Sequence, residues 1–228
     1  MRYVSLKYEE CDENGSDNEE KSMIKNVVFD LGRVMVRFER EYMVDPYVDK
    51  EEDIQLLEFI VTDRTYWDRL DKGTITDAEV VADCKRRLPE RLWQTVEKIY
   101  YNWVYNIPEI EGMSDVVRKV KNEYGKRVFL LSNISTYFAE HAAEVPCTAL
   151  FEKCIYSAVC GMVKPDREIF EYLCAECGIL PEETLFIDDS PKNIEGAQAF
   201  GIQGYLFDGD VAKLSAYLET QLKKQENV

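Results

Sequence analysis

The chain has 228 residues, of which 46% are hydrophobic, so it can form one large domain or a core domain with an insertion. Its formal net charge of −16 repels phosphate backbones, which argues against nucleic acid as a partner. No apolar run reaches membrane-spanning length and the first residues lack the apolar core of a signal peptide, so we expect a cytoplasmic protein with no membrane partner.

Residues 1–22 are polar and acidic and predict a poorly ordered tail. Residues 24–30 then predict the first strand, a short apolar run that ends in Asp30 and is followed closely by Gly32. An acid at the carboxyl end of a parallel strand lies where open α/β sheets bind ligands, and a nearby glycine lets the backbone approach an anion. Asp30 is therefore a candidate nucleophile or metal ligand, although an ordinary turn would use the same residue types.

Residues 38–107 predict an all-helical insertion, which we expect to contain four helices. Residues 54–61 carry apolar side chains at helical spacing, and Thr76 with Glu79 three positions later forms a capping box that begins another helix. Three tryptophans fall in this segment, and we expect them to form its core: Trp67, Trp93 and Trp103.

From residue 108 helices and strands alternate. Strands are predicted at 127–132, 153–157, 184–188 and 203–207, and helices at 112–123, 136–143, 166–177, 190–201 and 211–224. Such alternation implies an α/β fold, a Rossmann-like three-layer core with a mainly parallel sheet. We expect residues 23–37 and 108–228 to form this core, with the helical segment inserted into it.

Parallel strands bring their carboxyl ends to one edge of the sheet, and these ends carry polar side chains. Asp188 and Asp189 follow each other at the end of one strand, and they repel each other unless a cation lies between them and Asp30. The oxygen atoms of these three acids suit Mg²⁺. A lysine and a serine at this edge would bind phosphate oxygens. The side chains that we expect to meet there are Asp30, Ser132, Asn133, Lys164, Asp188 and Asp189.

Four stretches in this order resemble the motifs of the haloacid dehalogenase superfamily: FDLGRV at 29–34, LSN at 131–133, KPD at 164–166 and FIDDSPKNIEGA at 186–197. The resemblance extends from about residue 24 to the C-terminus, and the helical insertion is similar to the cap of the superfamily's first subclass. The sequence also resembles the sugar-phosphate phosphatases that act on glucose 1-phosphate, whose first motif likewise reads Asp-Leu-Gly.

The resemblance implies a role for each matching residue. Asp30 becomes an aspartyl-phosphate and Lys164 acts with it in catalysis. Mg²⁺ is held by Asp30, the backbone carbonyl of Gly32, Asp188 and Asp189, in a loop supported by Asn193. Substrate contacts are expected from Ser132, Asn133, Gly32 and Arg33.

The sequence departs from the family at Gly32. Phosphatases of this superfamily usually carry a second aspartate two residues after the nucleophile, which protonates the leaving group and then activates water; glycine can do neither. General acid–base catalysis is typically worth about 10²–10⁴-fold. The enzyme is thus expected to be slow, to favour good leaving groups, or to take a proton donor from the insertion, where candidates are Arg33, Arg40, Tyr42, Arg64 and Tyr66.

Three functions remain open on the sequence. The first is a Mg²⁺-dependent phosphatase of a small phosphorylated metabolite, in particular a sugar phosphate. The second is a non-catalytic binding or regulatory protein, against which the retained Asp30, Lys164 and Asp189 argue. The third is a dehalogenase, which needs no metal and is disfavoured by the pair of adjacent acids at 188 and 189. Monomer and homodimer are equally compatible with the sequence.

Overall fold

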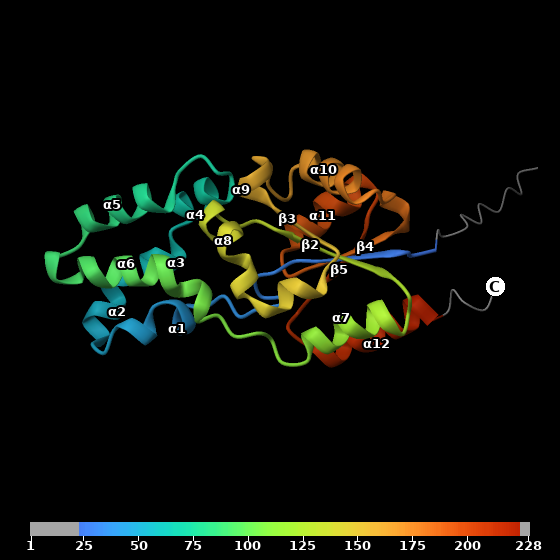
Figure 1. The fold of residues 1–228 in the computed structure, drawn as a ribbon, viewed down its shortest axis with the longest axis horizontal. Coiled ribbons are helices and arrows are strands. Elements are labelled where there is room, and N and C mark those ends of the chain that lie inside the picture. The colour runs from blue at the N-terminus through green and yellow to red at the C-terminus, as the bar shows by residue number, and fades with distance from the viewer. Residues whose placement is uncertain (1–22, 224–228) are drawn as a thin grey trace, which may run out of the picture.

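The centre of this computed structural model, which describes residues 23–223, is a five-stranded parallel sheet in the order β3-β2-β1-β4-β5 (Figure 1). The predicted acidic tail, residues 1–22, lies outside the described residues. The strands match the predicted ones to within about two residues at each end: β1 (Asn26–Phe29), β2 (Arg127–Ser132), β3 (Lys153–Tyr156), β4 (Thr184–Asp188) and β5 (Gln203–Leu206).

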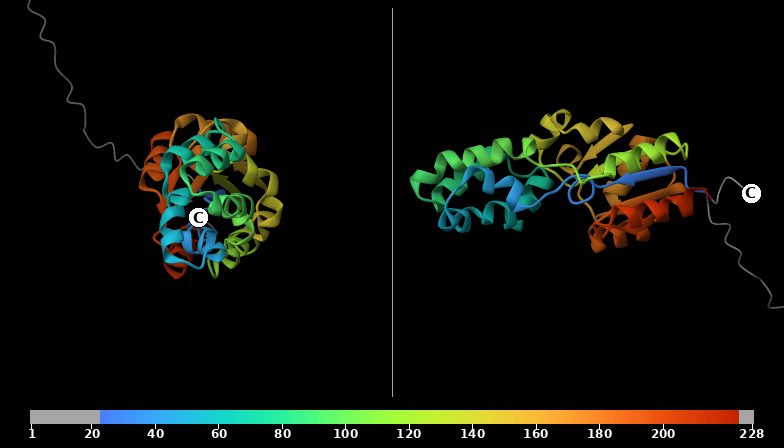
Figure 2. Two further views of the ribbon diagram at one scale, coloured as in Figure 1. Left: turned by 90° about the vertical axis from the view of Figure 1, so that its left-hand side faces the viewer. Right: turned by 90° about the horizontal axis from the view of Figure 1, so that it is seen from below.

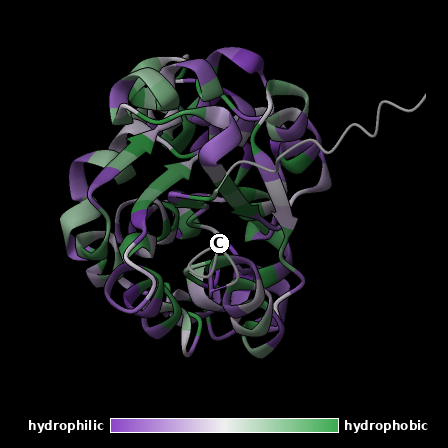
Figure 3. Ribbon diagram, turned by 90° about the vertical axis from the view of Figure 1, so that its right-hand side faces the viewer, coloured by the Kyte–Doolittle hydropathy of each residue, from purple (hydrophilic) through white to green (hydrophobic). Residues whose placement is uncertain are grey.

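Helices cover both faces of the sheet, which confirms the predicted three-layer core. Val27 and Phe29 point into a cluster with α7 (Met113–Asn122) and α12 (Val211–Lys223), whereas Val28 points to the opposite cluster with α10 (Arg167–Cys177) and α11 (Pro191–Phe200). Figure 3 shows the apolar strands enclosed by helices with polar outer sides. No helix within residues 23–223 is both long enough and apolar enough to cross a membrane.

Residues 38–107, between β1 and α7, form a separate group of helices at one end of the elongated molecule (Figures 1 and 2). It contains six α-helices instead of the four expected, because the extended backbone of Asp63 interrupts the helical run and its carboxylate caps a new helix by accepting from the amide of Thr65. The α-helices are α1 (Arg40–Met43), α2 (Glu51–Leu57), α3 (Phe59–Thr62), α4 (Arg64–Asp71), α5 (Asp77–Arg87) and α6 (Trp93–Asn102). The predicted capping box of Thr76 and Glu79 is confirmed at α5.

This helical insertion leaves and rejoins the core at one place. The incoming and outgoing chains pair as a short antiparallel bridge between Val36 and Glu109. The amide of Arg37 donates to the carbonyl of Pro108 at 2.8 Å, and the amide of Ile110 donates to that of Met35 at 2.9 Å. The two connections therefore form one paired neck.

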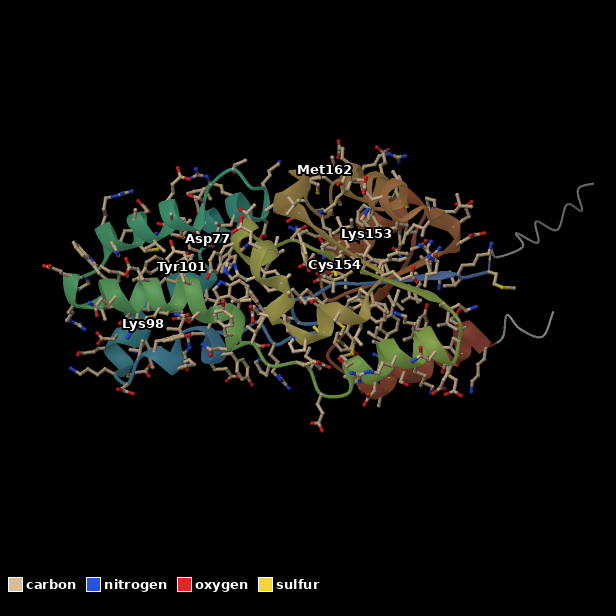
Figure 4. The ribbon with its side chains drawn as sticks, viewed as in Figure 1. Asp77, Lys98, Tyr101, Lys153, Cys154 and Met162 are labelled. Atoms are coloured by element: carbon tan, nitrogen blue, oxygen red, sulfur yellow. The ribbon has the colours of Figure 1, made fainter. Side chains whose placement is uncertain are left out.

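A second contact joins the insertion to α8 (Thr136–His141) of the core. The hydroxyl of Tyr137 donates to the carbonyl of Tyr101 at 2.8 Å, and the two rings meet edge to face. Asp77, at the start of α5, accepts hydrogen bonds from Ser135 and from the backbone of Tyr137; burial raises its pKa to about 6 despite these bonds. Figure 4 shows Asp77 and Tyr101 on the side of the insertion that faces α8. The insertion is thus attached to the core through α8 as well as through the neck.

Candidate active site

The register of the sheet brings the first and last motifs together. Phe29 is paired with Ile187 of β4 and with Leu130 of β2, so Asp30 and Asp188 are the next residues on neighbouring strands. The amide of Asp30 donates to the carbonyl of Ile187 at 2.9 Å. The strand order turns back at β1, and open α/β sheets bind ligands beyond the carboxyl ends of strands at such a point.

Lys164 lies between the two carboxylates. Its Nζ is 2.7 Å from Oδ1 of Asp30 and 2.7 Å from Oδ2 of Asp188, and it donates to the carbonyl of Leu131 at 3.0 Å. Only 1% of its side chain is exposed. Burial alone would lower the pKa of Lys164, but the two carboxylates outweigh burial and raise it. The lysine is therefore a buried, permanently charged ammonium.

Asp30 is 7% exposed at the bottom of a cavity. Burial raises its pKa, the charge of Lys164 lowers it, and the nearby Asp188 raises it again, with a net upward shift. Its Oδ1 forms the ion pair with Lys164, and no hydrogen bond within residues 23–223 engages Oδ2. One oxygen of this carboxylate is therefore available to a ligand.

The two adjacent acids at the end of β4 have different surroundings. Asp188 is fully buried; it accepts from the amide of Ser190 at 2.8 Å and from Asn193 Nδ2 at 3.0 Å on both oxygens, in addition to Lys164. Asp189 is partly exposed, and its pKa is raised by burial and by Asp188. Asp188 is thus bound to the loop through Ser190 and Asn193, while Asp189 lines the cavity.

The site fits a magnesium ion. Asp30, Asp188 and Asp189 each offer a carboxylate oxygen, and these atoms lie within 4.8 Å of one another. Hard oxygen donors are the ligands that Mg²⁺ prefers, and a cation would relieve the repulsion among these acids. Because the oxygens of Asp188 already accept four hydrogen bonds, Asp30 and Asp189 are the acids with free capacity.

Asn133 holds the loop that carries Lys164. Its Nδ2 donates to the carbonyl of Lys164 at 2.9 Å, and its Oδ1 accepts from the amide of the same residue at 2.8 Å. The sequence suggested that Asn133 orients the phosphoryl group, but both of its amide atoms are used on the backbone of Lys164. Ser132 remains free for that role: it lies at the end of β2 and lines the cavity, and Ser135 is the residue that caps α8.

A tight turn follows Asp30. The carbonyl of Leu31 accepts from the amides of Met35 and Val36 at 2.8 and 3.0 Å, and Arg33 takes a left-handed backbone with φ of 59°. A Cβ added at Gly32 would lie 3.8 Å from the ring side chain of Phe38, an ordinary contact. Position 32 therefore has room for a side chain, which would point toward an aromatic wall.

The cavity, of about 1080 Å³, lies between the sheet edge and the insertion. Its aromatic wall consists of Phe38, Trp67 and Trp103, whose ring centroids are 5.3 to 6.1 Å apart in edge-to-face geometry. Trp67 and Trp103 are buried as predicted, yet they also line the cavity. The expectation for Trp93 is wrong: this residue is 38% exposed, and its indole Nε1 donates to backbone carbonyls at the end of α5.

The proton donors considered from the sequence lie in different places. Arg33, Arg40 and Arg64 line the cavity, but Arg40 and Arg64 each form an ion pair with a nearby aspartate. Tyr66 opens instead onto a second hollow of about 590 Å³ on the insertion, where its hydroxyl bonds to an aspartate of α5 and to an arginine. Tyr42 is not among the residues that line the cavity between the sheet edge and the insertion.

Sequence reasoning missed three acids that line the cavity, Glu39, Asp68 and Asp71, and of these Asp71 has the most unusual surroundings. It is the last residue of α4, is 6% exposed, and its carboxyl has no hydrogen bond or ion pair within the described part of the chain. A signal was present, because helix C-termini favour cations and disfavour a carboxylate. An acid there, two residues before the turn at Gly73, is therefore unusual.

Comparison with known proteins agrees with these features. The family model for haloacid dehalogenase-like hydrolases matches residues 19–201. The chain is 27% identical over 198 residues to a D-ribitol-5-phosphate phosphatase of Bacteroides thetaiotaomicron, covering 80% of this chain and 91% of that protein. It is 26% identical over 185 residues to a sesquiterpene phosphatase of Aspergillus oryzae, covering 79% and 88%. A solved haloacid dehalogenase family enzyme of B. thetaiotaomicron, in complex with magnesium and inorganic phosphate, is similar with a TM-score of 0.61 and 26% identity, covering 84% of this chain and 98% of that one.

Proposed function

Because the chain belongs to the haloacid dehalogenase-like hydrolases, we propose that it is a Mg²⁺-dependent phosphatase of a small phosphorylated metabolite, with Asp30 as its nucleophile. One observation carries the proposal: Asp30 keeps a free carboxylate oxygen at the bottom of a cavity while buried Lys164 holds the other oxygen at 2.7 Å. A carboxylate fixed in this way can attack phosphorus in line. The named phosphatases among the relatives support the same chemistry.

In the first step, Oδ2 of Asp30 forms a bond to phosphorus and the bond from phosphorus to the leaving oxygen breaks, which gives an aspartyl-phosphate. Lys164 offsets the negative charge of Asp30 and of the phosphoryl oxygens, and the hydroxyl of Ser132 donates to one of those oxygens. Asp30, Asp189 and the carbonyl of Gly32 would hold Mg²⁺, which supplies further positive charge for the phosphoryl group. Water then releases phosphate and restores Asp30.

We propose a sugar or sugar-alcohol phosphate as the substrate. A cavity of about 1080 Å³ has room for a group much larger than phosphate. The wall of Phe38, Trp67 and Trp103 suits the apolar face of a sugar, and the exposed Arg33 at the turn offers donors to hydroxyl groups. Similarity to a D-ribitol-5-phosphate phosphatase supports this class.

The test is phosphate release from hexose phosphates, ribitol 5-phosphate, a terpenyl phosphate and p-nitrophenyl phosphate, with Mg²⁺ and with EDTA. The terpenyl ester is included because the aromatic wall also suits a prenyl chain and one relative is a sesquiterpene phosphatase. We expect Mg²⁺-dependent release that Asp30→Asn abolishes, with the exposed Asp115→Asn on α7 as the matched control. Turnover that survives Asp30→Asn would contradict the mechanism, and no release by the wild type from any ester would favour the non-catalytic alternative.

A further inference from the structure

The site has a nucleophile but no acid at position 32, and we propose that Asp71 of the insertion is the general acid and base of this enzyme. The inference rests on the proposed phosphatase function. Asp71 would supply from the insertion the proton transfer that Gly32 cannot perform.

The first support is the position of Asp71. Asp71 belongs to the insertion and lines the same cavity as Asp30 and Lys164 of the core. It is 6% exposed and lacks a hydrogen bond or ion pair within residues 23–223, whereas the exposed Asp68 one turn earlier is paired with Arg64. A buried carboxyl without a partner is costly, so it is expected to have a function in the cavity that it lines.

The second support is the way its turn is fixed. The amide of Gly73 donates to the carbonyl of Leu70 at 2.9 Å, which closes the turn after α4. A Cβ at Gly73 would lie 2.7 Å from the carbonyl oxygen of Ala158 in α9 (Ser157–Cys160), the short helix that leads to Lys164. The turn therefore rests directly on the core, and it holds Asp71 on the side of the insertion that faces the sheet edge.

The third support is electrostatic. Burial raises the pKa of Asp71 to about 7; Arg64 lowers it, Asp68 raises it and Lys164 lowers it. The carbonyl end of α4 disfavours the charged form as well. At neutral pH both protonation states are therefore populated, as a group that first gives and later takes a proton requires.

Over one turnover Asp71 gives one proton and takes one back. As Asp30 attacks phosphorus, protonated Asp71 gives its proton to the departing oxygen, and the product leaves as a neutral alcohol. Asp71, now a carboxylate, takes a proton from the water whose oxygen attacks phosphorus of the aspartyl-phosphate. The bond from phosphorus to Asp30 breaks, inorganic phosphate leaves, and Asp71 is protonated again.

The test compares Asp71→Asn with the wild type on two kinds of ester. On a sugar phosphate, whose alkoxide needs a proton, we expect turnover to fall by about 10²–10⁴-fold. On p-nitrophenyl phosphate, whose leaving group needs none, we expect one equivalent of nitrophenolate in a rapid burst, followed by slow turnover because the aspartyl-phosphate is hydrolysed without a base. The acid-precipitated protein should then carry phosphate, and Asp30→Asn should show no burst.

Two further variants make the outcome specific. Asp53→Asn on α2 removes an equally buried acid of the insertion that lies outside this cavity, and it should keep wild-type turnover. Glu39→Gln removes another acid of the cavity, one with a buried oxygen that has no hydrogen-bond partner, and it should not produce the burst. Three outcomes would overturn the role of Asp71: unchanged turnover in Asp71→Asn, loss of both burst and turnover in Asp71→Asn, or a burst in Glu39→Gln. In each case phosphate release by the wild type would leave the phosphatase proposal intact. If the wild type releases no phosphate, the phosphatase proposal itself fails.

Discussion

Gly196 of α11 is packed against Pro165 so closely that no larger residue fits. A Cβ added there would lie 2.5 Å from the carbonyl oxygen of Pro165 and 2.9 Å from its Cβ. Pro165 follows Lys164, whose ammonium forms an ion pair with Asp30 at the end of β1. The absence of a side chain at Gly196 therefore lets α11 pack directly against the loop that positions Lys164.

This contact predicts an unusual effect for Gly196→Ala. In a helix this change normally stabilises by up to about 1 kcal/mol. Here we expect a loss of about 1–3 kcal/mol in the free energy of unfolding, because the helix must move away from the loop, and a fall in kcat of at least about tenfold. Urea unfolding and steady-state kinetics measure both, with the neighbouring exposed Glu195→Ala as the control. A stabilised, fully active Gly196→Ala would contradict the packing argument.

Lys164→Met should damage both folding and activity. The change leaves Asp30 and the fully buried Asp188 without their shared cation. Breaking a buried ion pair on one side costs about 3–5 kcal/mol. We expect a loss of that order in urea unfolding and no measurable phosphate release, while Lys98→Met, on the outer side of the insertion (Figure 4), leaves both unchanged.

Gly32→Asp should be tolerated and should restore activity to Asp71→Asn. A Cβ at Gly32 makes only an ordinary contact with Phe38, and the backbone there is not left-handed. The new carboxyl would stand two residues after the nucleophile and could transfer the proton in place of Asp71. We expect the double variant to turn over a sugar phosphate at least about tenfold faster than Asp71→Asn alone. Equal rates, with both proteins folded by circular dichroism, would count against a proton-transfer defect in the single variant.

Asp71 should also lower the stability of the protein at alkaline pH. Its pKa is about 7 in the folded state against 3.8 for a free aspartic acid, so the folded protein keeps a proton that the unfolded chain loses. The free energy of unfolding therefore falls as pH rises from about 4 to 7. Asp71→Asn removes this effect, and we expect it to melt at a higher temperature than the wild type at pH 8, with a difference that shrinks toward pH 5. Calorimetry at both pH values measures this; a difference independent of pH would contradict burial of an unpaired carboxyl.

The sequence predicted the elements whose signals are local. Strand β4 and the left-handed Gly178 that ends α10 are where the apolar run and the glycine place them. The motif residues also converge as expected, because parallel strands in register bring Asp30 beside Asp188. The period of the apolar residues and the ends of the strands were sufficient for these predictions.

Features that depend on long-range packing could not be predicted. The carboxylate of Asp188 accepts hydrogen bonds from Lys164 and Asn193, which lie on two different segments. The sequence shows only two adjacent acids at the end of a strand, so it could not predict that the protein already uses the oxygens of Asp188. In the sequence Asp71 is an ordinary residue at the end of a helix, and only the packing of the turn at Gly73 against α9 shows its place beside the core. Trp93 has the residue type of a core but lies where α6 meets solvent. In each case the deciding contact is with a segment far away in the chain.

The paired neck of the insertion has an evolutionary consequence. Because the chain leaves the core after Met35 and returns at Ile110 through hydrogen bonds between the two connections, whatever lies between them adds no crossing and no strand to the sheet. Segments joined at such adjacent ends can be exchanged or lengthened without altering the host. The half of the cavity that the insertion forms, with Asp71 in it, can thus diversify while the half formed by the edge of the sheet stays fixed.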